Sequence, residues 1–139
     1  MSAPEPPPDG AALAEGWLSS SPFVAHLGIR LESLEPGRAR LAMPFSESLP
    51  TMGEVVHGGA VSSLIDTAAA AAAWSGAPVP ERIRASTIGM TVDFLSPARA
   101  TGVVADARVL RRGAITFIAV DVADEAGEAV ATALVTYRL

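Results

Sequence analysis

Cysteine, lysine, asparagine and glutamine are all absent from this 139-residue sequence, and its ten cationic side chains are all arginine. Without cysteine the protein can form no disulfide, thiol nucleophile or zinc-thiolate site, and without lysine it can form no Schiff base. The only imidazoles are His26 and His57, too few for an ordinary metal site. We therefore expect no metal and no redox cofactor, so that any reaction must use carboxylates, hydroxyls, imidazole or backbone groups.

Basic clusters and long uncharged apolar runs are lacking too. The formal net charge is −5 and the arginines are scattered, which excludes the clustered phosphate contacts of a nucleic-acid-binding protein. The apolar run over residues 55–74 contains His57 and Asp66, and a charge at mid-membrane costs roughly 3 kcal/mol, so we expect a buried helix and no membrane partner. The acidic, Pro-rich residues 1–10 have no signal-peptide features, which favours a cytoplasmic protein.

The order of periodic segments predicts an α+β fold. Four prolines in the first ten residues predict a disordered tail over residues 1–12, followed by a single domain over residues 13–139. We expect short helical segments up to residue 27, a strand over residues 38–43, a loop over residues 46–54 and one long helix over residues 58–74. Strands over residues 87–94, 102–110, 115–122 and 129–139 should follow as antiparallel neighbours, with the helix on one face of their sheet.

The predicted long helix opens with two glycines, Gly58 and Gly59, directly after His57. Glycines at a helix start leave backbone N–H groups unshielded at the positive end of the helix dipole, where they could stabilise the oxyanion of a reacting carbonyl. The alternative is that the glycines only permit a tight turn or close packing.

Asp66 lies about two turns into the same helix, beyond the reach of N-terminal capping. A carboxylate in so apolar a helix needs either a partner, such as an arginine, or a chemical role. Gly58 and Asp66 are eight residues apart, hence about 12 Å along the axis, too far to act on one carbonyl. Two antiparallel helices related by a two-fold axis would bring Gly58 of one chain to Asp66 of another, which makes a homodimer part of the mechanism.

The string His57-Gly58-Gly59, six residues, Asp66 and then a strand ending Phe94-Leu95-Ser96-Pro97 resembles the PaaI-type hotdog-fold acyl-CoA thioesterases. The resemblance runs from about Phe23 to Leu139, and includes Leu27-Gly28-Ile29 and Arg111-Arg112-Gly113. It implies a central helix wrapped by an antiparallel sheet of five to six strands. It also implies active sites at a homodimer interface, often within a dimer of dimers.

The resemblance further implies roles for individual residues. Asp66 would be the general base or nucleophile, the Gly58 N–H would hold the thioester oxygen, and His57 would orient or assist at the helix entrance. Many members place an asparagine before the glycines, and this chain has none, so that Thr51 or Glu54 would have to replace it. The remaining substrate-contacting residues would be Gly59, Ser86, Thr87, Arg111, Arg112 and Gly113. The alternatives are a helix-entry hydrogen bond for His57 and a solvated hairpin for the two arginines.

We therefore expect hydrolysis of a small or medium acyl-CoA or aryl-CoA to the free acid and CoA. The main alternative is a non-catalytic hotdog protein that binds an acyl-CoA or another small ligand, which the missing asparagine favours. A hotdog hydratase would need a paired Asp and His with a neighbouring Asn, and a serine hydrolase would need a G-x-S-x-G turn. The sequence has neither pattern.

Overall fold

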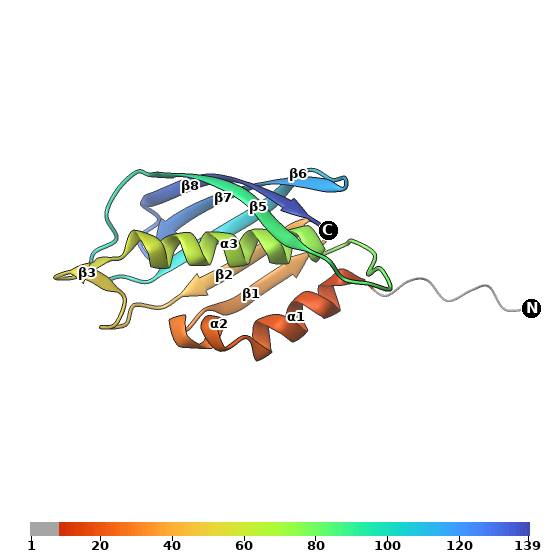
Figure 1. Ribbon diagram of the computed structural model, residues 1–139. Helices are drawn as coiled ribbons and strands as arrows, with labels where there is room; N and C mark the ends of the chain where they lie inside the picture. The colour runs from red at the N-terminus through yellow and green to blue at the C-terminus, as the bar shows by residue number, and fades with distance from the viewer. Residues whose placement is uncertain (1–8) are drawn as a thin grey trace, which may run out of the picture.

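The computed structural model describes residues 9–139, in which one long helix lies across a six-stranded antiparallel sheet (Figure 1). The helix is α3 (Gly58–Trp74), with the bounds predicted from the sequence. Across the sheet the strands follow the order β1 (Arg30–Glu35), β2 (Arg38–Met43), β6 (Val103–Arg111), β7 (Ile115–Asp124), β8 (Ala129–Arg138) and β5 (Ser86–Phe94). This is the predicted hotdog arrangement.

The small side chains of α3 set how closely it packs on the sheet. Leu64 and Ile65 are fully buried, and each alanine from Ala68 to Ala73 is at most 9% exposed. Because alanine adds little bulk, the helix backbone can approach β2, β6 and β7 closely. The polar stripe of the helix, which includes Asp66, is left half-buried at one side.

Short turns join β6 to β7 and β7 to β8 as antiparallel neighbours, as predicted. The prediction that β5 and β6 are neighbours was wrong, because β5 lies at the edge of the sheet beside β8, and β6 pairs with β2 and β7. Gly37 has a φ of 71° and makes the turn between β1 and β2, a conformation that glycine adopts without strain. β5 pairs with β8, and its register shifts between Thr87 and Gly89. This β-bulge changes which side chains of β5 face the helix.

Two helices precede the sheet, α1 (Gly10–Ser20) and α2 (Pro22–Leu27). Asp9 caps α1 through the Ala11 N–H and also accepts from the Gly76 N–H at 3.1 Å, which ties α1 to the end of α3. A side chain at Gly10 would collide with the main chain of Trp74. Of the predicted tail, residues 1–8 lie outside the described residues, and residues 10–12 belong to α1.

The predicted loop over residues 46–54 was only partly right. It contains β3 (Pro50–Met52), which pairs with β4 (Val55–Val56) across a turn at Gly53, whose φ is 59°. These strands are too short to show a period of two, which is why the sequence did not reveal them. No helix within residues 9–139 combines the length and apolar character needed to cross a membrane.

Candidate functional site

Asp66 meets Thr87 at the centre of the candidate site. The Thr87 hydroxyl donates to Asp66 Oδ1 at 2.6 Å, which joins α3 to β5. Both side chains are half-buried, and Asp66 takes part in none of the ion pairs among residues 9–139. The second carboxylate oxygen is therefore free to accept a proton or to attack a substrate.

The Asp66 carboxylate borders a cavity of about 470 Å³. Its polar edge contains Asp66, Thr87 and Ser86, three of the residues predicted for the site. The rest of the lining is mainly apolar, and comes from α1, α3, β8 and the segment before β5: Leu13, Trp17, Thr67, Ala70, Trp74, Ile83, Ala85 and Tyr137. A carboxylate at the edge of an apolar hollow suits a substrate with a reactive polar group and an apolar tail.

Two buried aromatic side chains, Trp74 and Tyr137, line this cavity. Trp74 Nε1 donates to the Tyr137 hydroxyl oxygen at 3.2 Å, and both residues are at most 7% exposed. Burial raises the pKa of Tyr137, the hydrogen bond from Trp74 opposes this rise, and the negative charge of Asp66 adds to it. The Tyr137 hydroxyl is consequently protonated at neutral pH.

The start of α3 forms a second region. His57 is the N-cap, and its Nδ1 accepts from the Gly59 N–H at 2.7 Å. A Cβ at Gly59 would lie 2.8 Å from this Nδ1, so only glycine permits the cap. The helix-entry role considered for His57 is thus present, and it occupies the amide of Gly59.

Gly58 keeps its amide available. Among residues 9–139 its N–H makes no hydrogen bond, and Gly58 borders a hollow of about 390 Å³ together with Thr51 and Phe94. A Cβ at Gly58 would lie 3.2 Å from the Phe94 ring, so the glycine also serves close packing. Gly58 and Asp66 border different hollows, so a single chain does not bring the two residues together.

The other predicted substrate contacts lie elsewhere. Arg112 donates to the carbonyl oxygens of Ala73 and Ser75 at 2.6 and 3.0 Å, where its charge stabilises the negative end of the α3 dipole. Arg111 is the exposed last residue of β6, and Gly113 is exposed on the turn between β6 and β7. Glu54 is also exposed, and its carbonyl oxygen accepts from the Ala100 N–H. None of these four residues borders the Asp66 cavity.

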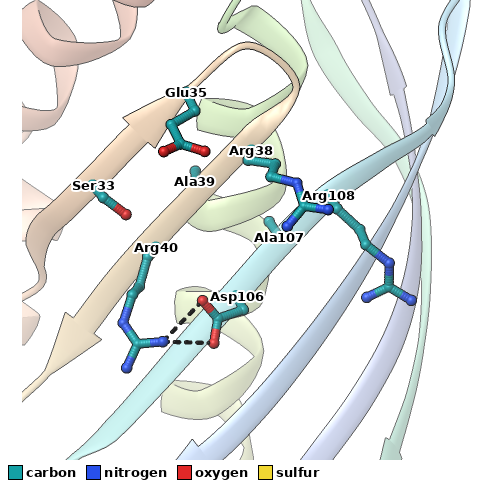
Figure 2. Close-up of a pocket in the computed structure, with 8 residues that line it drawn as sticks. All are labelled: Ser33, Glu35, Arg38, Ala39, Arg40, Asp106, Ala107 and Arg108. Carbon is teal, nitrogen blue, oxygen red and sulfur yellow. Dashed lines mark hydrogen bonds and ion pairs between the residues drawn. The ribbon is translucent and has the colours of Figure 1, made fainter.

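A separate hollow of about 220 Å³ lies on the opposite face of the sheet (Figure 2). Arg40 donates there to Glu32 at 2.9 Å and to both carboxylate oxygens of Asp106. Arg38 lies directly across from Arg108 on the neighbouring strand. Because exposed ion pairs contribute at most about 1 kcal/mol each, we interpret this network as surface charge. Within residues 9–139 no group of three or more acidic or histidine side chains could hold a metal ion.

Comparisons with known proteins identify the family. A family model described as "Domain of unknown function (DUF4442)" matches residues 10–139. The chain belongs to this family. It is 36% identical over 114 residues to "Putative esterase VNG_1336C" of Halobacterium salinarum, across 80% of this chain and 75% of that protein.

Solved structures agree with this assignment. A thioesterase family protein from Silicibacter pomeroyi has 30% identity and a TM-score of 0.82, covering 93% of this chain and 96% of that one. The E. coli PaaI protein from the phenylacetic acid degradation operon has 26% identity and a TM-score of 0.79, covering 93% and 95%. The chain is thus a PaaI-type hotdog thioesterase by family, which confirms the predicted fold and the predicted enzyme class of thioester hydrolase.

Proposed function

We propose that the protein hydrolyses the thioester of a small or medium acyl-CoA or aryl-CoA, with Asp66 as the catalytic carboxylate. The observation that supports this most directly is the Asp66–Thr87 hydrogen bond at the edge of an apolar cavity. Thr87 orients one oxygen, and the other can deprotonate a water molecule. The new C–O bond then forms, the C–S bond breaks, and the proton passes to the CoA sulfur. Direct attack by Asp66 on the thioester is the alternative route.

We further propose that each site lies between two chains. The Gly58 N–H would stabilise the thioester oxygen, and it would come from the subunit opposite the one that supplies Asp66. Strand β5 supports this proposal, because it is the edge strand of the sheet and, within the described residues 9–139, pairs with β8 alone. Its apolar side chains Ile88 and Phe94 are each 55% exposed, and Met90 is 37% exposed. An apolar, unpaired sheet edge is a common surface for joining two copies of a chain.

Purified protein would be assayed with acetyl-, hexanoyl- and benzoyl-CoA while the free thiol is followed. Loss of the positioned carboxylate in Asp66→Ala should lower kcat/KM about 100-fold to 10,000-fold, the range typical of a general base. Asp121→Ala is the matched control, because Asp121 is an exposed aspartate on the outer face of the sheet and does not border the Asp66 cavity. Equal turnover by the wild type and Asp66→Ala on every substrate would refute the assignment.

The non-catalytic alternative makes a different prediction. An acyl-CoA-binding protein without activity would be stabilised against heat by these thioesters or by CoA, yet would release no thiol. Both measurements can be made on the same samples. The cytoplasmic location, the dimer of dimers and the roles of Thr51, Glu54, Arg111 and Gly113 stay predictions.

A further inference from the structure

The hydroxyl group of Tyr137 has a proton with no acceptor in the structure. The indole N–H of Trp74 can only donate, so the Tyr137 oxygen must accept in the bond between them. The phenolic proton must then point elsewhere, and among residues 9–139 the Tyr137 hydroxyl makes no hydrogen bond besides the one from Trp74. Tyr137 is 7% exposed and borders the Asp66 cavity. Because Tyr137 lines that cavity, its hydroxyl proton is available to an acceptor on a ligand bound there.

The place of Tyr137 in the sheet connects it to the reaction centre. The register of β5 and β8 pairs Thr87 with Tyr137, and side chains paired in this way lie on one face about 5 Å apart at Cβ. Thr87 holds Asp66 at 2.6 Å. A thioester placed at Asp66 would therefore have Tyr137 and Trp74 in the wall of the same cavity, next to Thr87.

The surroundings define what the acceptor can be. Leu13, Trp17 and Ile83 line the cavity around the two aromatic groups, so most of the acyl group must be apolar. The charge of Asp66 acts on Tyr137, and it would repel an anionic substituent at this place. A neutral oxygen atom fits both conditions.

We propose that Tyr137 is a specificity-determining residue that donates a hydrogen bond to a neutral oxygen, such as a keto or hydroxyl oxygen, on the acyl group of the substrate. This rests on the proposed thioesterase function and narrows it from acyl thioesters in general to oxygenated ones. The enzyme should therefore have a lower kcat/KM for an acyl group of the same length that lacks the oxygen, because that group would leave the Tyr137 donor unpaired.

Hexanoyl-CoA and its 3-oxo, 4-oxo and 5-oxo derivatives test this, since a keto oxygen only accepts hydrogen bonds. The wild type should favour at least one oxo isomer over hexanoyl-CoA by about tenfold in kcat/KM, the value of one hydrogen bond of roughly 1.4 kcal/mol. In Tyr137→Phe the same ratio should fall to about one. Trp74→Phe removes the neighbouring donor and keeps the Tyr137 hydroxyl, so this variant should retain the preference.

The outcomes separate this inference from the proposed function. Hydrolysis of hexanoyl-CoA without preference for any oxo isomer would overturn the role of Tyr137 and leave the thioesterase intact, whether or not Tyr137→Phe folds. If no thioester is hydrolysed, binding of the corresponding non-hydrolysable CoA thioethers would be measured by calorimetry. Tighter binding of one oxo thioether by the wild type, lost in Tyr137→Phe, would support the role of Tyr137 alone. Equal binding would overturn it.

Discussion

Two threonine–aspartate hydrogen bonds lie on opposite faces of the sheet, and their surroundings differ. On the outer face Thr132 donates to Asp121 at 2.9 Å, and Asp121 also forms an ion pair with Arg108. On the helix side Thr87 donates to Asp66 at 2.6 Å, and the described residues provide no ion-pair partner for Asp66. The outer carboxylate is exposed and neutralised, whereas Asp66 is half-buried beside aromatic and aliphatic side chains.

The ion pair and exposure of Asp121 account for its charge as part of the folded surface, whereas the charge of Asp66 needs a functional explanation. A charge removed from water without a compensating cation lowers stability. Asp121 avoids this cost by its exposure and its arginine. Asp66 is only half-exposed and, among residues 9–139, has no arginine partner. Proteins keep such carboxylates mainly where they act on a ligand.

We expect the largest change in kcat/KM when one carboxylate on each face of the sheet is replaced by its amide and the two variants are compared. Asp66→Asn keeps the size of the side chain and its bond with Thr87, but cannot accept a proton, so kcat/KM should fall about 1,000-fold. Asp106→Asn, which weakens the outer pair with Arg40, should leave kcat/KM at the wild-type value. Thiol release from acyl-CoA measures both. A similar loss in the two variants would mean that Asp66 acts only through stability.

A second prediction separates Gly58 from Asp66. Gly58→Pro removes the amide proton at the first helical position, where proline is tolerated, and should lower kcat about 100-fold. Gly58→Ala also places a Cβ against the Phe94 ring but keeps the amide proton, so it should retain most of the activity. Mixing Gly58→Pro with Asp66→Ala, after unfolding and refolding together, should restore about one quarter of wild-type activity, because half of the dimers are mixed and each has one intact site. Activity no higher than that of the separate variants would place both residues in one chain's site.

Matched threonine variants test the two hydrogen bonds themselves. Thr87→Val should lower kcat/KM about tenfold, since Asp66 would lose the donor that orients it. Thr132→Val should leave kcat/KM unchanged, because Asp121 retains Arg108. Steady-state kinetics with the best substrate would check this. If Thr87→Val has wild-type activity, the orientation of Asp66 comes from the helix alone.

The face of the sheet on which Thr87 lies could not be predicted from the sequence pattern of β5. The helix was predictable because its apolar residues repeat at helical spacing and Gly76 and Pro78 follow it. The alternation along β5 groups Thr87 with Gly89, Thr91 and Asp93, away from Met90. The bulge between Thr87 and Gly89 breaks that alternation, so that Thr87 and Met90 turn to the same side. A bulge depends on pairing with β8, which periodicity within β5 cannot reveal.

The aromatic part of the site was missed for a related reason. Trp17, Trp74 and Tyr137 come from α1, α3 and β8, and each is an isolated aromatic residue in its own segment. No spacing within the sequence connects them. Their meeting depends on the docking of α1 through Asp9 and Gly10, and on the register between β5 and β8. The resemblance to PaaI-type proteins identified the polar residues Asp66 and Thr87, whereas it carried no information about the cavity wall.

Replacing Asp9, which attaches α1 to the end of α3, should have a smaller effect, and this effect should be on the thermal stability of the protein. Hydrogen bonds from the Ala11 and Gly76 N–H groups lower the pKa of Asp9 below 3.8, and Arg112 adds to this. A lowered folded-state pKa means that this stabilisation is present above about pH 4 and is lost as the pH falls through the folded value. Asp9→Ala should lower the Tm at pH 7, and the difference from the wild type should shrink toward pH 3. Asp9→Asn, which keeps a neutral cap, should be less affected at pH 7.

We expect the smallest change, a small decrease in the free energy of unfolding, when Arg40 on the outer face of the sheet is replaced. Its side chain is 46% exposed although it contacts both Glu32 and Asp106. Solvent screens both pairs, so Arg40→Met should lower the free energy of unfolding by less than about 1 kcal/mol, and less at high salt. Urea unfolding at 0.05 and 0.5 M NaCl would measure this, with thiol release as the check on activity. A large loss of activity with unchanged stability would mean that the outer face takes part in substrate binding, and that the difference between the two faces is smaller than we infer.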